Sequence, residues 1–256
     1  MSKLMEGKLA LVLGIANRWS LAYAIAQAFS KHGATLVLTY LGERQKGAIE
    51  ELARDFETAA ILPCDVTHDD DLNALTESLR ALNRPLHAVV HSLAFANKED
   101  LTRPFLETSR SGFLLAQDVS AYSLVAVARA TAPLMTEGGS LSTLTYLGAT
   151  RVVTNYNVMG VAKASLESAM RYLASEMGPR GIRVNAISAG PVKTASARAI
   201  KDFSSILETI AERAPLRRNT EPSEVADTAL FLASDLGRGV TGNVLFVDAG
   251  MQTMAF

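Results

Sequence analysis

The chain has 256 residues, of which 48% are hydrophobic and 20% are charged, so it holds enough apolar material for a substantial core. Its formal net charge of −1 argues against a general nucleic-acid binder, because such proteins carry a basic excess. Cys64 is the only cysteine, which excludes an intramolecular disulfide and fits a reducing cytosol.

The first apolar run of the chain, Leu9–Leu13, stops at a glycine and is soon followed by Asn17 and Arg18. This run is too short for a signal peptide or a membrane span. We therefore expect a soluble cytoplasmic protein that does not associate with membranes.

Short apolar runs alternate with longer amphipathic stretches along the whole chain, and continuously apolar runs are typical of strands buried on both faces of a parallel sheet. The predicted strands are Leu9–Leu13, Thr35–Thr39, Ala60–Pro63, Ala88–His91, Leu141–Thr145, Arg183–Ile187 and Val244–Val247. The predicted helices lie near 20–32, 44–57, 69–82, 119–136, 158–177 and 222–235. This alternation predicts a Rossmann-like, doubly wound α/β fold of about seven parallel strands with helices on both faces. Length alone would also allow two small domains, but no linker or repeat divides residues 1–256, so we expect one domain.

The stretch Tyr122–Ala130 is apolar on nearly all sides of a helix. Such a helix is usually buried in the core of its own chain. A helix that is shared with another subunit would show the same pattern.

The segment that follows the first strand reads G-I-A-N-R-W-S-L-A, from Gly14 to Ala22, and leads into a helix. A phosphate binds the free N–H groups of a helix start, aided by the helix dipole. Gly14 permits a tight turn, and Ser20 either caps the helix or donates to a pyrophosphate oxygen. The G-x-G-x-x-G fingerprint is absent, and an ordinary strand–turn–helix junction would have this pattern too.

The ends of three later strands carry further candidate residues for binding a cofactor. They read Cys64-Asp65-Val66, Ser92-Leu93-Ala94 and A-G-P-V-K-T at 189–194, and Asp65 could accept from an adenine amino group. Each alone is an ordinary turn. Because the carboxyl ends of parallel strands meet at one edge of a sheet, together they predict a dinucleotide site. No metal site is predicted.

The end of the second strand, T-Y-L-G-E-R from Thr39 to Arg44, bears on the type of dinucleotide. It has no acid at Leu41 for a ribose and no basic pair at Leu41 and Gly42 for a 2′-phosphate. Arg44 could reach such a phosphate, although Glu43 beside it opposes that charge. Both are also ordinary charges of a first helical turn. The pattern favours NADH over NADPH.

Tyr156 and Lys163 lie seven residues apart in a predicted helix. Seven residues make nearly two turns, so both side chains share one face, about 10 Å apart along the axis. A phenol can donate to a developing oxyanion, and an ammonium can hold ribose hydroxyls, which suits hydride transfer to a substrate carbonyl system. A packed tyrosine and a solvated lysine would give the same isolated spacing.

The chain resembles the short-chain dehydrogenases/reductases, and more closely their bacterial enoyl-[acyl-carrier-protein] reductases. Most of that superfamily uses Tyr-x3-Lys, whereas the enoyl reductases use Tyr-x6-Lys. The segments that carry the resemblance are N-Y-N-V-M-G-V-A-K-A-S (155–165), T-L-T-Y-L-G (143–148), R-V-N-A-I-S-A-G-P-V (183–192), I-K-D-F (200–203) and A-P-L-R-R (214–218). The resemblance covers nearly the whole chain, from about Gly7 to Gly250.

The resemblance implies reduction of a trans-2 enoyl thioester by NADH, the last reductive step of elongation in type II fatty acid synthesis. Tyr156 would hydrogen-bond the thioester oxygen, Lys163 would hold the nicotinamide ribose, and Tyr146 matches a second active-site tyrosine. The implied cofactor residues are Gly14, Ser20, Leu21, Leu41, Asp65, Val66, Ser92, Leu93, Ala94, Lys163, Val192, Lys193, Thr194, Ala195 and Ser196. The implied substrate residues are Ala96, Tyr146, Tyr156, Met159, Phe203 and Ile206, with a mobile substrate-binding segment near 194–207.

The resemblance also implies partners: acyl carrier protein as the carrier of the enoyl chain, and further copies of the chain in a homotetramer. Lys193, Arg198 and Lys201, against the single acid Asp202, would form a basic dock for the acidic carrier. Scattered solvated charge is the alternative. The chain departs from some relatives at Trp19, Leu41 and Ala94, which affects the adenosine end of the site.

Two other functions stay open at this point. A carbonyl-reducing relative, such as a 3-oxoacyl-thioester reductase, should show Tyr-x3-Lys, but the residue four after Tyr156 is Gly160. A dinucleotide-binding protein that senses redox state without catalysis would not need both Tyr156 and Lys163.

Overall fold

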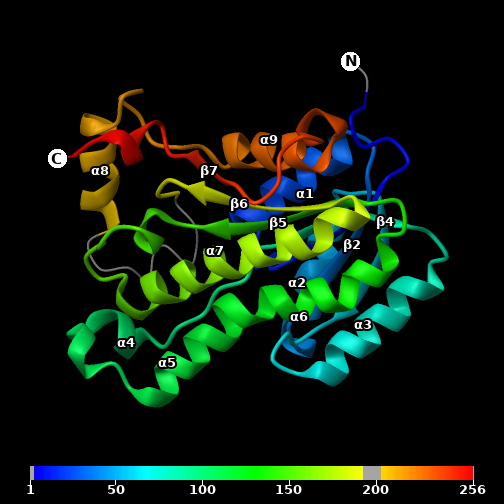
Figure 1. Cartoon of the computed structure of the whole chain (residues 1–256), viewed down its shortest axis with the longest axis horizontal. Helices are drawn as coiled ribbons and strands as arrows, with labels where there is room; N and C mark the ends of the chain where they lie inside the picture. The colour runs from blue at the N-terminus through cyan, green and yellow to red at the C-terminus, as the bar shows by residue number, and fades with distance from the viewer. Residues whose placement is uncertain (1–2, 193–202, 256) are drawn as a thin grey trace.

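Seven parallel strands form one sheet in the computed structural model, which describes residues 3–192 and 203–255 (Figure 1). Their order is β3-β2-β1-β4-β5-β6-β7, so the chain moves outward from β1 to β3 and then returns to the other side of β1. The direction reverses between β1 and β4, which is where doubly wound folds bind their ligands. The strands are β1 Leu9–Leu13, β2 Thr35–Tyr40, β3 Thr58–Pro63, β4 Leu86–His91, β5 Gly139–Thr145, β6 Ile182–Ala189 and β7 Val244–Val247.

Burial along the strands follows their place in the sheet. Every residue of β1 and β2 is buried, whereas the edge strands β3 and β7 are only partly buried. Central strands face apolar side chains above and below, which explains their continuously apolar sequences.

Helices cover both faces of the sheet and enclose two hydrophobic cores. One core joins the sheet to α1, α2 and α9, and the other joins it to α3, α6 and α7; Figure 1 shows α1 and α9 on one side of the sheet and α7 and α6 on the other. The helices are α1 Leu21–Lys31, α2 Glu43–Ala53, α3 Asp69–Ala81, α4 Lys98–Thr102, α5 Arg110–Gln117, α6 Ser123–Thr131, α7 Asn157–Met177, α8 Phe203–Arg213 and α9 Pro222–Ala233.

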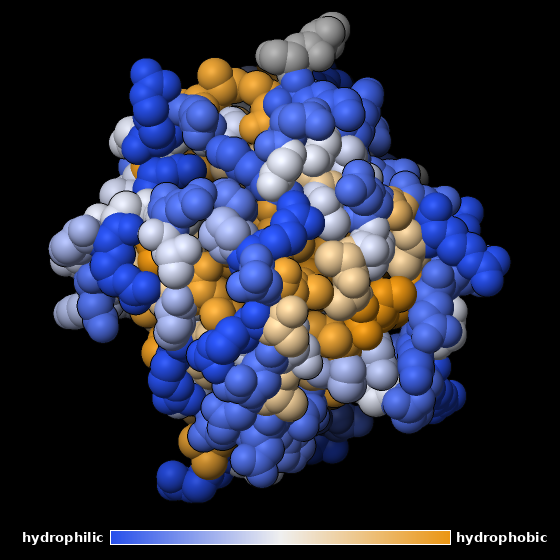
Figure 2. Space-filling view, turned by 90° about the vertical axis from the view of Figure 1, so that its right-hand side faces the viewer, coloured by the Kyte–Doolittle hydropathy of each residue, from blue (hydrophilic) through white to orange (hydrophobic). Residues whose placement is uncertain are grey.

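The strand arrows point to the left in Figure 1, so the carboxyl edge of the sheet lies on that side. Figure 2 shows the opposite, amino-terminal end, where apolar residues in the middle are surrounded by hydrophilic ones. Because ligands of doubly wound sheets bind beyond the carboxyl ends of the strands, the candidate site lies away from the surface in Figure 2.

The predicted fold and all seven strands are confirmed, with identical bounds for β1 and β7. The predicted start of the helix near 119–136 is wrong, because helical structure begins at Arg110. A π-helical turn at Asp118–Tyr122 joins α5 to α6, and its extra residue shifts the apolar positions out of phase. The helices α4 and α8 were not predicted either.

The Arg110–Leu134 stretch is long and apolar enough to cross a membrane by length and composition, but half of its most apolar window is buried inside the protein. A core helix of a soluble protein has the same properties. Most residues of Tyr122–Ala130 are buried, including Leu124 and Val127, which confirms burial within its own chain. Tyr122 and Arg129 are the exposed exceptions.

Several predicted residues lie outside the described part of the chain. They are Lys193, Thr194, Ala195 and Ser196 of the cofactor set, Arg198, Lys201 and Asp202 of the basic dock, and most of the 194–207 segment. Phe203 and Ile206 belong to α8, but their side chains are not described.

Candidate active site

Gly14 lies where the ends of β1 and β4 come closest. Its φ is +94°, and a Cβ built on it would fall 2.0 Å from the carbonyl oxygen of Ser92. The Ser92 N–H in turn donates to the Leu13 carbonyl at 3.2 Å. Gly14 is therefore required by the packing of the strand ends, and the same absence of a side chain leaves room beside the start of α1.

Ser20 is the N-cap of α1. Its hydroxyl accepts from the Tyr23 N–H at 3.3 Å and donates to the Asn17 carbonyl at 2.7 Å. Of the two roles predicted for Ser20, the structure shows the cap. α1 therefore begins beside Gly14, with the positive end of its dipole at the carboxyl edge of the sheet.

The ends of β2 and β3 lie side by side, because the Cys64 N–H donates to the Tyr40 carbonyl at 3.0 Å. Leu41 and Asp65, the next residues on each strand, therefore share one region, and Leu41 is 53% exposed. Asp65 accepts from the N–H and the hydroxyl of Thr67 at 2.9 and 2.7 Å. Burial opposes ionisation of Asp65, but these two hydrogen bonds, together with the neighbouring His68, outweigh it and lower its pKa. Asp65 is thus a carboxylate, able to accept from an amino group.

Tyr146 and Tyr156 pack edge to face, with ring centroids 5.0 Å apart and planes inclined by 70°. Tyr146 follows β5, and Tyr156 stands at the N-cap of α7, where its N–H donates to the Val153 carbonyl at 3.1 Å. Burial raises the pKa of both phenols; nearby Asp248 adds to the shift for Tyr146. Both phenols therefore keep their protons near neutral pH and can donate a hydrogen bond.

Two glycines allow this contact between the β5 end and α7. A Cβ at Gly148 would lie 2.4 Å from the Tyr156 ring, and a Cβ at Gly160 would lie 2.8 Å from the Gly148 carbonyl oxygen. Gly160 is the position at which Tyr-x3-Lys would place a lysine. The close approach of the Gly148 turn leaves no room for one, so the lysine follows one turn later, at Lys163.

Lys163 is 5% exposed and donates through Nζ to the Leu144 carbonyl at 2.8 Å. Burial lowers its pKa to about 8, while Glu167 acts in the opposite direction. An ammonium group has three N–H donors, so, within residues 3–192 and 203–255, the bond to Leu144 leaves two for other acceptors. Lys163 is therefore a buried, partly satisfied donor on the same face of α7 as Tyr156.

His91, at the end of β4, is fully buried beside Lys163. Its Nε2 and Nδ1 lie 2.9 Å from the hydroxyls of Ser123 and Thr143. Ser123 donates to the Val119 carbonyl, so its oxygen accepts from Nε2–H, while the Thr143 hydroxyl lies close to both Nδ1 and the His91 carbonyl oxygen, the latter 3.3 Å away. Burial lowers the pKa of His91 to about 3, and the neighbouring Lys163 charge adds to this shift. His91 is thus neutral and serves as a packed, fully bonded group.

The residues that were expected to line the acyl pocket, and that the structure describes, lie in one apolar cluster. Buried Met159 belongs to it, and Ala96 and Tyr156 pack against it. Ser120, from the π-helical turn, holds the neighbouring loop by accepting from the Phe95 N–H at 2.9 Å and donating to its carbonyl at 3.1 Å. This cluster offers an apolar wall beside the phenol of Tyr156.

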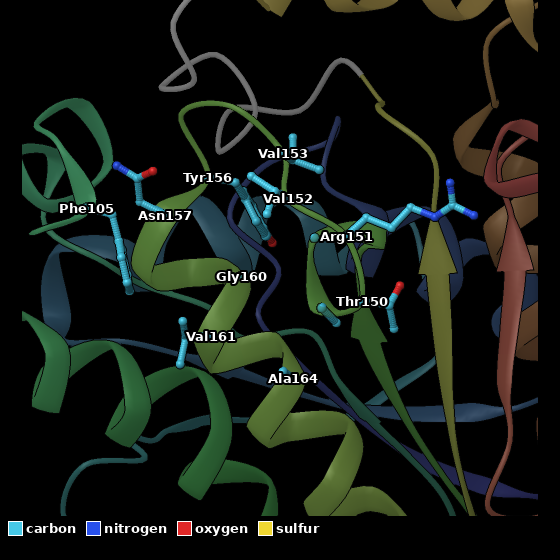
Figure 3. Close-up of a pocket in the computed structure, with 12 residues that line it drawn as sticks. Phe105, Thr150, Arg151, Val152, Val153, Tyr156, Asn157, Gly160, Val161 and Ala164 are labelled. Atoms are coloured by element: carbon cyan, nitrogen blue, oxygen red, sulfur yellow. The ribbon is translucent and has the colours of Figure 1, made fainter. Parts of the chain in front are cut away.

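An open pocket of about 460 Å³ lies on the other side of Tyr156 (Figure 3). Figure 3 shows Tyr156 between α7 and the 148–153 segment, with Phe105 and Val161 facing the pocket and Arg151 extending away from α7. Its lining within the described residues includes Tyr156 but none of the expected cofactor residues. The pocket is therefore distinct from the predicted dinucleotide site.

Comparison with known proteins agrees with this geometry. The sequence profile of the family described as Enoyl-(Acyl carrier protein) reductase matches residues 14–252. The chain belongs to this family. It is 55% identical to the Bacillus cereus enoyl-[acyl-carrier-protein] reductase [NADH] FabI, covering 98% of this chain and 99% of that protein. It is also 48% identical to a Staphylococcus aureus enoyl-[acyl-carrier-protein] reductase [NADPH] FabI, covering 98% of each.

Solved structures of other family members superpose closely on this enoyl reductase fold. The crystal structure of the B. cereus enoyl-acyl carrier protein reductase with NADP+ and indole naphthyridinone gives a TM-score of 0.98 at 53% identity, covering 100% of both chains. The Aquifex aeolicus enoyl-[acyl-carrier-protein] reductase (NADH) gives 0.95 at 43% identity, covering 99% of both. The family therefore supports a nicotinamide dinucleotide as cofactor, with either nucleotide represented among relatives.

The structure brings together most of the described residues that the sequence singled out. Tyr146, Tyr156, Met159 and Ala96 adjoin one another, and Gly14, Ser92 and Leu93 meet at the switch point. Val66 and Val192 are both buried, but they follow β3 and β6, which lie on opposite sides of β1 in the sheet. Sequence reasoning missed Thr145 and Glu167, which bond to each other on the inner face of α7. The sequence signal that could have found this pair is the position of Glu167, a charged residue four positions after Lys163 on the same helix face.

Proposed function

We propose that this protein is an NADH-dependent enoyl-[acyl-carrier-protein] reductase that reduces the trans-2 double bond of an enoyl thioester. The observation that carries the proposal is the placement of Tyr156 and Lys163 on one face of α7, with the Gly160–Gly148 contact excluding the Tyr-x3-Lys alternative. This spacing separates the phenol from the ammonium, as a conjugated substrate requires when hydride enters at the β-carbon and charge appears on the thioester oxygen.

The residues at the carboxyl edge fit a nicotinamide dinucleotide. The side-chain-free Gly14 and the α1 N-terminus suit a pyrophosphate, the Asp65 carboxylate suits an adenine amino group, and the buried Lys163 suits ribose hydroxyls. When bound, the reduced nicotinamide supplies the hydride. Val192 and the Ser92–Ala94 segment would complete the binding site, together with 193–196.

Tyr156 would donate its phenolic hydrogen bond to the thioester oxygen and stabilise the negative charge that develops there. Its protonated state follows from burial, which raises its pKa. Met159 and Ala96 would line the acyl chain and exclude water from the reacting atoms. Lys163 would orient the cofactor and add positive charge nearby.

Three further features belong to this proposal. The enoyl chain would arrive on acyl carrier protein, the reaction would occur in the cytoplasm, and the enzyme would be a homotetramer. Exposed apolar side chains support self-association: Leu106 is 98% and Leu114 is 60% exposed, and Val152, which lines the open pocket together with Phe105, is fully exposed. Light scattering at several concentrations would measure the subunit number.

The activity is tested by mixing the protein with NADH and a crotonyl thioester and following the reduced nicotinamide absorbance. Oxidation of NADH with the enoyl thioester supports the proposal. Activity with a 3-oxoacyl thioester alone would indicate a carbonyl reductase. Binding of NADH without turnover of either substrate would indicate a redox-sensing protein.

A further inference from the structure

Two adjacent residues of β5 bond to two buried charged residues of α7. The Leu144 carbonyl accepts from Lys163 Nζ at 2.8 Å, and the Thr145 hydroxyl donates to Glu167 Oε1 at 2.7 Å. Lys163 and Glu167 are 5% and 6% exposed. Since they lie four residues apart, both share the helix face of Tyr156. The β5 end thus holds the two charged groups separately.

Stability alone does not account for Glu167. Removing a carboxylate and an ammonium from water costs several kcal/mol per ion. A protein that has apolar residues of similar volume in their place is often as stable or more stable. A direct ion pair would recover part of that cost. Lys163 and Glu167, both within the described residues, form no such pair, because each bonds to β5 instead.

Few charged groups surround the Lys163 ammonium. Glu167 lies on its own helix, His91 of β4 is neutral, and β5 carries no ionisable residue. Burial lowers the pKa of Lys163 to about 8, and Glu167 is the charge that opposes this shift. The other ionisable groups of the elements packed on α7 are Lys98, Glu99 and Asp100 of α4, Arg110 of α5, Asp118 and Tyr122 of the π-helical turn, Arg129 of α6, Arg180 of the Gly178–Arg180 turn, and Arg183 of β6, which donates to the Ser234 and Val240 carbonyls.

We propose that Thr145 and Glu167 form a positioning pair for Lys163. Glu167 keeps the ammonium charged in its buried place, and Thr145 holds the carboxylate away from Nζ. The remaining N–H groups of Nζ are thereby left for the ribose hydroxyls of the cofactor. This inference rests on the proposed function, in which Lys163 binds that ribose.

The first test measures NADH affinity by fluorescence titration between about pH 6 and about pH 9.5, a range that brackets the Lys163 ammonium. In the parent protein, affinity should fall as the pH rises through the Lys163 pKa of about 8. Glu167→Gln keeps an oxygen for Thr145 but removes the charge, so this fall should move to lower pH by about one unit. Glu176→Gln removes an exposed charge from the same helix and should leave the curve in place.

The second test changes the hydroxyl. Thr145→Val frees the Glu167 carboxylate to pair with Lys163, so NADH affinity at neutral pH should fall about 10-fold, the worth of one charge-assisted hydrogen bond. Thr145→Ser keeps the hydroxyl and should restore affinity close to that of the parent protein. Circular dichroism at each pH establishes that the variants are folded; the isosteric Glu167→Gln carries the test if Thr145→Val does not fold.

Lys163→Met separates the two proposals. If Lys163→Met weakens NADH binding while Glu167→Gln leaves the pH curve of the parent protein unchanged, the positioning pair is overturned and the role of Lys163 stands. An equal loss of affinity by Glu167→Gln at every pH would assign Glu167 a structural role and also overturn the inference. If Lys163→Met binds NADH like the parent protein, the ribose assignment itself fails, and the positioning pair fails with it.

Discussion

Tyr146 and Tyr156 meet edge to face across the junction of β5 and α7, with their ring centroids 5.0 Å apart. An edge-to-face pair contributes about 0.5–1.5 kcal/mol beyond burial of its surface, so each ring fixes the other. Tyr146 thereby limits the rotation of Tyr156, while both hydroxyls keep their protons because burial raises both pKa values. The two phenols have to be distinguished by experiment.

Tyr156→Phe should lower kcat about 10- to 100-fold, because the loss of one hydrogen-bond donor to the oxyanion should cost roughly 1.4–2.7 kcal/mol. NADH affinity should hardly change, since the phenol serves the substrate. Steady-state kinetics with the crotonyl thioester and a separate NADH titration measure the two effects.

Tyr172→Phe is the matched control, because Tyr172 lies on the same helix but is 78% exposed. It should leave kcat and NADH affinity unchanged. Unaltered turnover in Tyr156→Phe would contradict its assigned role and would direct attention to Tyr146→Phe.

Gly160→Ala should destabilise the protein by about 1–3 kcal/mol, although alanine is the better helix former. Its Cβ would lie 2.8 Å from the Gly148 carbonyl oxygen and would push the turn away from α7. Because Tyr156 packs on Gly148, kcat should fall as well. Urea unfolding and steady-state kinetics measure both effects.

Gly47→Ala provides the contrast within the same protein. Gly47 also lies inside a helix, α2, but a Cβ there meets nothing within 4 Å. This variant should gain about 0.5–1 kcal/mol of stability at unchanged kcat. A stabilised Gly160→Ala would show that the Gly148 contact does not constrain the site.

The sequence predicted the sheet well because its central strands are buried on both faces and read as unbroken apolar runs. The prediction of helix bounds from the sequence was wrong around Arg110–Thr131. There the π-helical turn changes the phase of the apolar positions between two short helices. Gly112 also obscured the first of these helices. A Cβ there would lie too close to the buried Asp100 carboxylate, so this helix glycine reflects a tertiary contact.

The candidate site was predictable where spacing along a helix or position at a strand end decides it, as for Tyr156, Lys163 and Gly14. Contacts between elements were not predictable. The Thr145–Glu167 bond and the His91 contacts with Ser123 and Thr143 depend on how α6 and α7 sit against β4 and β5. No spacing within one segment encodes those distances.

NADH should give a higher kcat/KM than NADPH. Leu41 offers no charge to a 2′-phosphate, and the Lys46 ammonium lies 3.7 Å from Glu43. Gly42, with φ of +68°, disfavours a side chain, so a basic residue is better placed at 41. Leu41→Arg should raise kcat/KM for NADPH about 10-fold, with little change for NADH. A preference of the unmodified protein for NADPH would contradict this prediction, and Arg44→Ala would then test that residue as the phosphate ligand.

His91 should make the folded protein less stable as the pH falls below 6.5. Its pKa is lowered from 6.5 to about 3 in the folded state, so between these values only the unfolded chain binds this proton. The free energy of unfolding should therefore decrease by about 1.4 kcal/mol per pH unit on this account as the pH falls, with no such effect above 6.5.

Urea unfolding of the parent protein and of His91→Gln across this range isolates the effect, since the substitution removes the titrating group. His91→Gln should be less stable near neutral pH, because its bonds to Ser123 and Thr143 change, but its curve should be flatter on the acid side. His68→Gln, at a side chain that is 68% exposed, should keep the slope of the parent protein. Equal acid slopes in the parent protein and His91→Gln would mean that His91 takes up its proton in the folded state, which would contradict the neutral form assigned to it beside Lys163.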